Sequence, residues 1–439
     1  MSGDVFPADF VFGVATSAYQ VEGGIENDWS DWERSGKCKD KAARCGNSVE
    51  HWERFFDDVQ LITRLGATAY RLSIEWARVE PKRGEWDESA WSGYRARLEA
   101  LVKAGITPVV TLLHFTHPRW FHVETPWHEK SSLVAWERYA KRCAELLDGL
   151  NVHITTINEP NVFLLGGYLA GMMPPGIADG RKAFAATANL VRAHVIARNA
   201  ILDRRRSTGV AAPQIGIAQN MLLFAPSRRW HPLDQALTRL AEGNYNHGFL
   251  EAISTGELRL QMPGFTAGRE RIDGAAKSSD FTGLNYYSRT HLRFIAKAPW
   301  VQFEFLDRHA RGLTDIGWEW YPEGFGQILH QLKRYQLPVW ITENGLDDRR
   351  GARRSQYLYE HWKELLRARA DGVDVRGYLH WSLMDNFEWL EAWGPRFGLY
   401  RVDRTTMNRE WTAACEYFRS VATTRRLTPP PAAEQKSAA

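Results

Sequence analysis

Leu337-Pro338-Val339-Trp340-Ile341-Thr342-Glu343-Asn344-Gly345 is a short apolar run that ends in a carboxylate, with turn residues immediately behind it. A run of this length and composition predicts a buried β-strand. The stretch from His153 to Pro160 has the same form and ends in Asn158-Glu159-Pro160. A lone glutamate at such a place would have a surface or helix-capping role. Two of them become informative if the fold brings both strand ends together.

Short β-rich runs alternate with helical patterns along the chain. Eight runs predict strands at 11–16, 69–74, 107–113, 153–158, 214–219, 280–285, 338–342 and 375–381. Helical patterns follow them at 49–65, 88–103, 133–147, 181–205, 233–252, 324–335, 355–370 and 412–422. No linker interrupts this series, so the alternation and the count predict a single (β/α)8 TIM barrel over residues 1–426. The tail 427–439 contains three consecutive prolines and is expected to be disordered.

Composition is that of an ordinary soluble globular protein, with 44% hydrophobic and 25% charged residues. The net charge is only +4 and the basic residues are scattered, which argues against a nucleic-acid partner. No apolar run approaches the roughly 18 residues of a membrane span, and the chain begins without a basic and apolar leader. A cytoplasmic protein without a membrane partner is therefore expected, while the formation of a homo-oligomer stays open.

Four cysteines are too few for a disulfide scaffold, and their spacing matches no zinc site. Cys143 and Cys415 lie on helical patterns, where a buried thiol is expected. Cys38 and Cys45 share one loop, and their pairing stays open, although a reducing cytoplasm is the simpler interpretation. His114 and His117 are the residues closest to a metal-binding pattern, but without a third ligand nearby no metal is expected.

The 19 tryptophans are the least ordinary feature of the composition, and many lie near turn signals. Core packing explains part of this number. A carbohydrate cleft explains it equally well, because the apolar face of a pyranose lies flat on an aromatic ring while the indole N–H still donates a hydrogen bond.

Barrels carry their chemistry at the C-terminal ends of their strands, so this fold gives Glu159 and Glu343 a common location. Hydrolysis of a glycosidic bond needs one carboxylic acid to protonate the leaving oxygen and one carboxylate to attack or stabilise the anomeric carbon. We expect Glu159 to be the acid, with a pKa raised by nearby negative charge. We expect Glu343 to be the nucleophile, kept ionised by Arg71 at the end of the second strand.

Other strand ends carry side chains suited to a sugar. Amides, an imidazole and a further carboxylate can form paired hydrogen bonds to vicinal hydroxyls, and indoles can supply flat walls. The residues concerned are Gln20, His114, Asn285, Tyr287, Trp381, Glu388 and Trp389.

The chain resembles glycoside hydrolase family 1, the family of β-glucosidases and β-galactosidases, from end to end. The motifs that carry the resemblance lie at 6–10, 13–23, 70–74, 158–160, 283–287, 317–319, 341–345 and 381–389, and they include Tyr70-Arg71-Leu72-Ser73-Ile74, Gly317-Trp318-Glu319 and Trp381-Ser382-Leu383-Met384-Asp385-Asn386-Phe387-Glu388-Trp389. Each motif is weak alone, but their order over about 400 residues is specific.

This resemblance implies a retaining mechanism with Glu343 as nucleophile, Glu159 as acid/base, and no metal or cofactor. It implies further roles for the residues around them: Arg71 and Tyr287 orient the nucleophile, Asn158 contacts the sugar 2-hydroxyl, Gln20, His114, Trp381, Glu388 and Trp389 hold the glycone, and Trp318 lies on the aglycone side. The implied substrates are small β-glycosides or short oligosaccharides, which include fragments from cellulose degradation. A β-glucosidase is expected first, and glucose, galactose and fucose all stay open as the glycone.

Two departures from the family pattern bear on the substrate. Phe115 stands after the strand-end His114 where most members have a tryptophan. Leu390-Glu391-Ala392-Trp393 lacks the Ser and Lys that mark 6-phosphoglycosidases, and Glu388 would repel a phosphate, so an unphosphorylated substrate is expected. The alternatives are a transglycosidase that uses the same covalent intermediate and a non-catalytic carbohydrate-binding barrel. The presence of both glutamates argues against the second.

Overall fold

The computed structural model describes residues 4–261, 268–297 and 301–431. Eight parallel strands close into a barrel in the order β1-β13-β12-β9-β5-β4-β3-β2. Their bounds are β1 Val11–Ala15, β2 Ala69–Ser73, β3 Thr107–Leu113, β4 His153–Asn158, β5 Gln214–Asn220, β9 Phe281–Asn285, β12 Val339–Glu343 and β13 Val375–Trp381. Each predicted strand matches one of these to within one residue at either end. The predicted (β/α)8 barrel is therefore confirmed.

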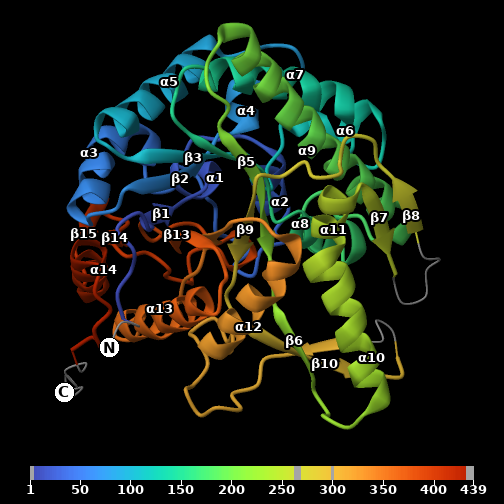
Figure 1. Cartoon of the computed structure of the whole chain (residues 1–439). Helices are drawn as coiled ribbons and strands as arrows, with labels where there is room; N and C mark the ends of the chain where they lie inside the picture. Colours follow the sequence, from blue (N-terminus) through green and yellow to red (C-terminus); the bar gives the residue numbers. More distant parts are fainter. Residues whose placement is uncertain (1–3, 262–267, 298–300, 432–439) are drawn as a thin grey trace.

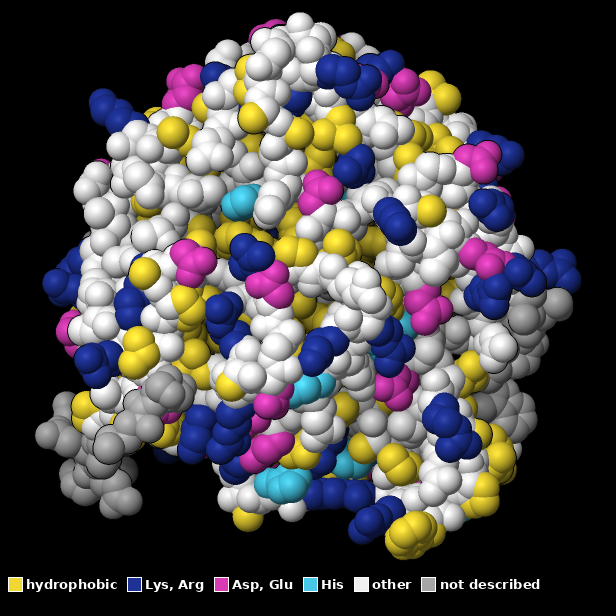
Figure 2. Space-filling model, viewed as in Figure 1, with side chains coloured by type: hydrophobic (Ala, Val, Ile, Leu, Met, Phe, Trp, Pro, Cys, Tyr) yellow, Lys and Arg dark blue, Asp and Glu magenta, His cyan; other side chains and the backbone are white. Residues whose placement is uncertain are grey.

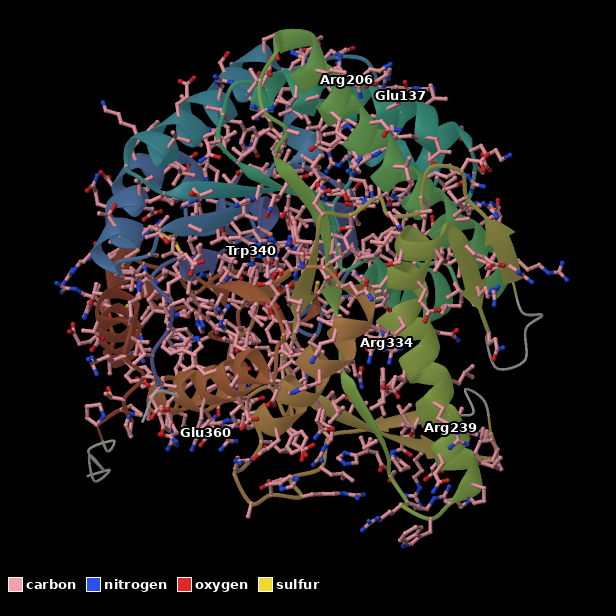
Figure 3. The ribbon with its side chains drawn as sticks, viewed as in Figure 1. Glu137, Arg206, Arg239, Arg334, Trp340 and Glu360 are labelled. Carbon is pink, nitrogen blue, oxygen red and sulfur yellow. The ribbon has the colours of Figure 1, made fainter. Side chains whose placement is uncertain are left out.

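Helices surround the barrel (Figure 1). The principal ones are α3 His51–Arg64, α5 Glu88–Lys103, α7 Ser131–Leu147, α9 Gly180–Thr208, α10 Pro232–Ala241, α11 Gly248–Thr255, α12 Pro322–Leu332, α13 Arg354–Ala370 and α14 Ala413–Thr424. Because these helices cover the outside of the sheet, the barrel strands are buried on both faces and read as near-continuous apolar runs. Trp340 of β12 packs against His153 and Phe281 among the strands, whereas Glu137 and Arg206 lie on outer helices (Figure 3).

The predicted helix 233–252 is divided in the structure. Between α10 and α11 lies η2, a π-helical segment at Glu242–His247. A second π-helical segment, η1 at Leu164–Leu169, follows the short helix α8 at Pro160–Phe163. Each π-helical segment has only six residues, which is too short for hydrophobic periodicity to distinguish it from an α-helix.

Elements between the barrel units were not predicted. A three-stranded sheet forms from β6 Leu223–Pro226, β10 Arg289–Phe294 and β11 Val301–Glu304, in the order β11-β10-β6. Because β6 follows β5 and β10 follows β9, this sheet lies at the C-terminal end of the barrel (Figure 1). The other additions are the strand pairs β7 Glu257–Leu260 with β8 Gly268–Arg271 and β14 Arg401–Asp403 with β15 Asn408–Glu410, and the short helices α1 Ala18–Val21, α2 Asp28–Arg34, α4 Trp76–Val79 and α6 Arg119–Glu124.

The start of the C-terminal tail differs from the prediction. Leu427 is buried, and its N–H donates to the carbonyl of Asp4 at 2.8 Å, while the carbonyl of Thr428 accepts from the Tyr417 hydroxyl. The prediction of disorder from residue 427 is therefore wrong at its first residues, because burial of the Leu427 side chain holds them. Residues 432–439, to which the prediction also applied, lie outside the described residues.

All four cysteines are free and buried, including Cys38 and Cys45. The Cys45 thiol donates to the carbonyl of Tyr19 instead. Within the described ranges, the helices are all too short or too polar to cross a membrane.

Candidate active site

A cavity of about 340 Å³ opens at the C-terminal ends of the barrel strands. Nine of the twelve predicted site residues line it: His114, Asn158, Glu159, Tyr287, Trp318, Glu343, Trp381, Glu388 and Trp389. The other three, Gln20, Arg71 and Asn285, are fully buried directly behind them. We call this cavity the strand-end pocket. It gathers residues from seven separate barrel units because parallel strands of a barrel all present their carboxyl ends on one side.

Glu343 ends β12 and is held by two donors. Arg71, from β2, donates Nη1 to Oε1 of Glu343 at 2.5 Å, and the Tyr287 hydroxyl donates to Oε2 at 2.7 Å. Arg71 is fully buried, and its Nε donates to the hydroxyl of Thr111. Both carboxylate oxygens of Glu343 are therefore fixed, one by a charge and one by a phenol.

Glu159 follows β4 and meets amides instead of a cation. The side-chain amides of Asn285 and Asn220 both donate to Oε1 of Glu159, at 2.8 and 2.9 Å. Because one oxygen accepts both bonds, it behaves as the carbonyl oxygen and leaves Oε2 as the atom that can carry a proton. Asn220 is itself oriented by the hydroxyl of Tyr245, which donates to its Oδ1 at 2.7 Å.

A chain of hydrogen bonds joins the two glutamates. Arg71 donates Nη2 to Oδ1 of Asn158 at 2.6 Å, and Asn285 donates to the same oxygen at 3.2 Å as well as to Glu159. The Thr342 hydroxyl donates to Oδ1 of Asn285, which fixes the orientation of that amide. The positions of both carboxyls are therefore determined by one buried network.

Glu159 and Glu343 differ in the causes that set their pKa values. Burial, followed by the charge of Glu343, raises the pKa of Glu159 to about 8. The sequence predicts nearby negative charge as the cause, whereas loss of hydration is the larger one. Burial also raises the pKa of Glu343, and there Arg71 and Tyr287 oppose it. A single proton shared by the pair is therefore placed on Glu159, the carboxyl without a cation.

The opposite wall of the strand-end pocket combines aromatic rings with polar groups. The imidazole of His114 is near parallel to the rings of Trp381 and Trp389, with centroids 6.0 Å apart in both cases. Asn158 donates to Nε2 of His114, so Nδ1 carries the proton, and this buried N–H has no partner in the described part of the chain. Burial and the charge of Arg71 lower the pKa of His114 well below its usual value, which keeps the ring neutral.

Glu388 is the third carboxyl of the strand-end pocket. Burial and the neighbouring carboxyls Glu343, Asp347 and Glu159 raise its pKa to about 8. Gln20 donates Nε2 to Glu388 at 3.3 Å and to the carbonyl of Phe387 at 2.8 Å. Gln20 therefore positions Glu388 and does not itself line the cavity.

Trp318 lies near Tyr287, with ring centroids 5.5 Å apart, and both pack against Phe397. This aromatic group belongs to the same apolar cluster as Trp381. It meets Tyr287, a contact of Glu343, so it lies beside the carboxyl pair.

Asn220 and Tyr245 belong to the hydrogen-bond network of Glu159, and the sequence analysis did not predict them. Asn220 is the last residue of β5, a position that the predicted strand at 214–219 stopped just short of. A strand-end asparagine was therefore a signal in the sequence. Tyr245 had no such signal, because it lies within η2.

Outside the strand-end pocket, Asp28, His117 and His122 form a cluster of three residues of the types that bind metals. The sequence did not predict that Asp28 and His122 lie near His117. Oδ2 of Asp28 lies 3.0 Å from Nδ1 of His117 and 3.0 Å from Nε2 of His122. Trp127 donates its indole N–H to Nε2 of His117 at 2.8 Å, so Nδ1 of that ring carries the proton and donates to Asp28. A metal ion would need the lone pair of Nδ1. Burial would raise the pKa of Asp28, but the two histidine hydrogen bonds outweigh it and hold that pKa at about 2.

Comparison with known proteins gives one consistent answer. The sequence model of "Glycosyl hydrolase family 1" matches residues 2–427. A 1,4-β-D-glucan glucohydrolase from Thermotoga neapolitana is 32% identical, over 92% of this chain and 99% of that protein. A β-galactosidase from Pyrococcus woesei is 29% identical, over 92% of this chain and 94% of that protein. The structure of a β-glycosidase from Pyrococcus horikoshii superposes with a TM-score of 0.88 at 35% identity, over 97% of this chain and 96% of the other.

These matches extend over nearly the whole chain, as the sequence motifs do. Both relatives and the solved structure are β-glycosidases by name, which agrees with a pocket built around paired carboxyls. The protein is a glycoside hydrolase, and it belongs to glycosyl hydrolase family 1.

Proposed function

We propose that this enzyme is a retaining β-glycosidase that acts first as a β-glucosidase on small glycosides and short oligosaccharides. It would remove terminal non-reducing β-D-glucosyl residues through a covalent glycosyl-enzyme. The observation that carries the proposal is the difference between the two buried carboxyls: Glu343 is bound to Arg71, whereas Glu159 is bound only to neutral amides.

The first step uses both carboxyls at once. The Glu343 carboxylate attacks the anomeric carbon while the bond from that carbon to the leaving oxygen breaks. The proton of Glu159 passes to the leaving oxygen, so that an alcohol departs instead of an alkoxide. A pKa of about 8 keeps Glu159 protonated at neutral pH. Tyr287 and Arg71 hold Glu343 in place for the attack.

The second step reverses the roles. Once Glu343 is an ester it carries no charge, so one of the causes that raises the pKa of Glu159 is removed. Glu159 then accepts a proton from water as the water oxygen attacks the anomeric carbon and Glu343 leaves as a carboxylate. Two inversions at the same carbon give net retention.

The glycone would lie between His114, Trp381 and Trp389. The unpartnered Nδ1–H of His114 is a donor for a sugar hydroxyl, Glu388 with its pKa of about 8 can donate as well as accept at neutral pH, and Asn158 would contact the 2-hydroxyl. The described residues that line the strand-end pocket include no lysine or arginine to pair with a phosphate, which supports an unphosphorylated sugar. The related glucohydrolase and β-galactosidase support glucose and galactose as the first glycones to test.

The nucleophile is tested with Glu343→Gly and an aryl β-glucoside. We expect activity to fall by several orders of magnitude with the fold retained, and azide to restore turnover by giving the α-glucosyl azide. In Glu159→Ala, azide should instead react with the covalent intermediate and give the β-glucosyl azide. Glu137→Gln, on the outer face of α7, serves as the matched control. Unchanged activity in Glu343→Gly, or the same azide anomer from both variants, contradicts the assignment.

Transglycosylation at the same intermediate is the second candidate outcome. Product analysis at high substrate, with and without added alcohol or sugar acceptors, distinguishes it from hydrolysis. NMR of the first anomer released provides the independent test of retention, because an initial α-product from a β-glycoside contradicts a retaining mechanism.

A further inference from the structure

Three residues of the strand-end pocket surround the ring of Trp389. Trp29, from α2, packs against Trp389 with ring centroids 4.7 Å apart. Phe115, which follows β3, meets the same indole edge-on at 5.3 Å, and His114 before it lies near parallel to that indole. We call these four residues the Trp389 wall. Two segments of the chain, α2 and the turn after β3, therefore build one wall of the pocket.

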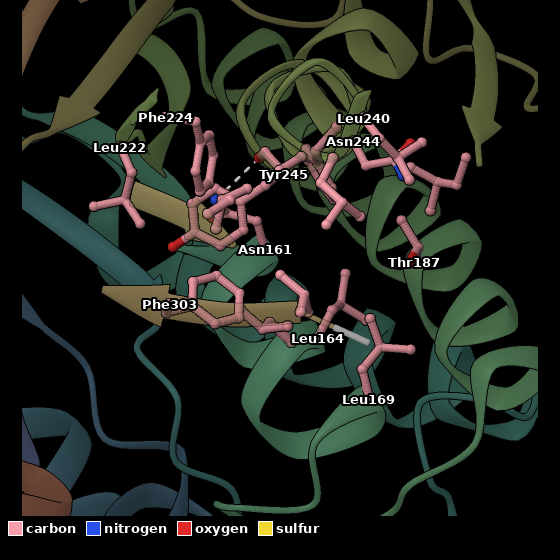
Figure 4. A pocket seen from close by; sticks show the side chains of 17 residues that line it. Asn161, Leu164, Leu169, Thr187, Leu222, Phe224, Leu240, Asn244, Tyr245 and Phe303 are labelled. Carbon is pink, nitrogen blue, oxygen red and sulfur yellow. Dashed lines mark hydrogen bonds between the residues drawn. The ribbon is translucent and has the colours of Figure 1, made fainter. Parts of the chain in front are cut away.

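A second cavity, of about 200 Å³, adjoins the strand-end pocket (Figure 4). Leu222 and Tyr245 line both cavities, and Tyr245 is hydrogen-bonded to the Asn220 that holds Glu159. None of the residues of the Trp389 wall lines this second cavity. In the proposed reaction the leaving group departs from Glu159, so the Trp389 wall belongs to the part of the pocket that holds the glycone.

The turn after β3 has a strained backbone at Phe115. The N–H of Thr116 donates to the carbonyl of His114 at 2.9 Å, and Phe115 between them has a φ of 68°. These are the features of a γ-turn with positive φ at its central residue, which is rare and strained. A residue other than glycine keeps this conformation only where the surrounding contacts hold it. The contacts beside the turn therefore determine where His114 and Phe115 lie.

Two carboxyl groups hold the residues that follow Phe115. The Thr116 hydroxyl donates to Oε2 of Glu75 at 2.8 Å. The backbone N–H of His117 donates to Oδ1 of Asp28 at 2.9 Å, and Nδ1–H of the same residue donates to Oδ2 at 3.0 Å. The backbone N–H of Asp28 donates in return to the carbonyl of His117 at 3.1 Å. Residues 116 and 117 are therefore fixed through both backbone and side chain.

Asp28 also holds the other segment of the Trp389 wall. It directly precedes Trp29, and the backbone N–H of Trp29 donates to Oδ1 of Asp28 at 3.0 Å. Asn27, which caps α2, donates its side-chain amide to Oε1 of Glu75 at 3.5 Å. The two carboxyl groups are therefore neighbours, and together they tie α2 to the turn after β3.

Asp28 and Glu75 differ from the acidic residues of the protein surface. On the face shown in Figure 2, acidic side chains lie at the surface among lysine and arginine side chains. The side chain of Asp28 is only 8% exposed and Glu75 is 1% exposed, and neither pairs with a lysine or arginine in the described part of the chain. A buried carboxyl group destabilises the fold unless its oxygens accept hydrogen bonds. Movement of the turn would remove those bonds, so the turn is held in one position.

We propose that Asp28 and Glu75 are positioning residues, which act through the turn at Phe115 to hold His114 against a hydroxyl of the glycone. This inference rests on the proposed function, because it places the glycone at the Trp389 wall. Neither carboxyl group lines the strand-end pocket. Their loss should therefore weaken recognition of one sugar hydroxyl and leave the acid and the nucleophile in place.

The test compares kcat/KM for p-nitrophenyl β-D-glucoside with kcat/KM for the analogues that lack its 3-, 4- or 6-hydroxyl. His114→Ala first identifies the hydroxyl that His114 binds, because this substitution should have little effect on the analogue without that hydroxyl. Thr116→Val then deletes only the group that binds Glu75. Asp28→Asn places an amide N–H opposite the donors of His117.

We expect Thr116→Val and Asp28→Asn each to lower kcat/KM for the parent glucoside roughly three- to tenfold, which is the range for one hydrogen bond. For the analogue that His114→Ala identifies, the loss should be less than about twofold, because the bond in question is already absent. For the other two analogues the loss should equal that for the parent glucoside.

Matched variants control for a general loss of stability. Asp31→Asn makes the same substitution in the same helix, where the Asp31 side chain is 51% exposed. Thr423→Val does so for an exposed threonine of α14. Glu75→Gln keeps an oxygen that accepts from Thr116 and should resemble the wild type, whereas Glu75→Leu should resemble Thr116→Val. Near-UV circular dichroism verifies the fold of each variant.

The possible outcomes separate this inference from the proposed function. If Thr116→Val and Asp28→Asn lower kcat/KM by one factor for the parent and all three analogues, they do not act through His114, and the inference is overturned while the proposed function stands. Wild-type kcat/KM in both variants overturns it as well. If Asp28→Asn does not fold, Thr116→Val decides, because it replaces one hydroxyl by a methyl group. If the wild type hydrolyses no β-glycoside, the proposed function itself fails, and this inference fails with it.

Discussion

Glu159 and Glu343 have the same side chain but different hydrogen-bond partners. Glu343 accepts from a guanidinium and a phenol, whereas Glu159 accepts from two amides through one oxygen. Neutral donors stabilise a carboxylate less than a cation does, so the proton of the pair remains on Glu159. We propose that Asn220 acts on Glu159 as a positioning residue.

Asn220→Ala tests this role. The hydrogen bond from Asn220 favours the charged form of Glu159 and lowers its pKa, so its loss should raise the pKa further. The alkaline limb of kcat/KM, expected near pH 8 in the wild type, should move to higher pH by roughly half a unit to one unit. Tyr245→Phe should shift the limb in the same direction by less, because Asn220 remains but loses its anchor. Asn151→Ala is the control, because Asn151 is exposed and lies just before the first residue of β4, far along that strand from Glu159. A shift to lower pH would contradict the assignment.

Three residues that follow barrel strands have a strained backbone. Phe115 after β3, Glu159 after β4 and Trp389 after β13 all have left-handed conformations, with φ of 68°, 44° and 50°. All three line the strand-end pocket. Residues other than glycine adopt this region at an energetic cost, and such residues concentrate at functional sites. The surrounding contacts of the barrel mouth therefore hold the backbone where local preference would not.

Gly345 lies where the ends of β12 and β13 approach closely. A Cβ at this position would lie 1.9 Å from the carbonyl oxygen of Trp381, so any side chain would force the two strand ends apart. Gly345→Ala should therefore displace both Glu343 and Trp381.

We expect kcat/KM for an aryl β-glucoside to fall at least tenfold in Gly345→Ala, and Tm to fall by several degrees. Gly243→Ala is the matched control, because a Cβ there meets no atom within 4 Å. Its Tm should be unchanged or raised. Wild-type activity in Gly345→Ala would show that the strand ends can separate without moving the site.

On the scale of the whole molecule, the barrel mouth concentrates buried carboxyls. Burial, with neighbouring carboxyls, raises the pKa of Glu159 and Glu388 to about 8 and that of Glu75 to about 7. In the unfolded chain these groups titrate near 4.5. Between pH 4.5 and 8 these three carboxyls therefore bind more protons in the folded protein than in the unfolded chain, and the stability that they contribute falls as pH rises.

Glu159→Gln should reduce this loss, because an amide takes the place of the protonated acid and needs no proton. We expect its Tm to equal that of the wild type near pH 4.5 and to exceed it by roughly 2 to 5 °C at pH 8. Thermal unfolding at several pH values measures the difference, with Glu137→Gln on the protein surface as the control. A Tm gain that is the same at pH 4.5 and pH 8 would argue against titration of Glu159.

The sequence alone determined the barrel and the places of its site residues. Apolar runs mark buried strands through local patterning, and parallel strands of a closed barrel all end on one side, so Glu159 and Glu343 could be located before any contact was known. The tertiary structure alone decided their surroundings. The hydrogen bonds of Asn220 and Tyr245 depend on contacts between residues far apart in the sequence, and Tyr245 lies in the π-helical segment η2, which is too short to leave a distinct hydrophobic pattern. Local patterning specifies which residues are buried, whereas closure of the barrel decides which buried groups meet and where their protons reside.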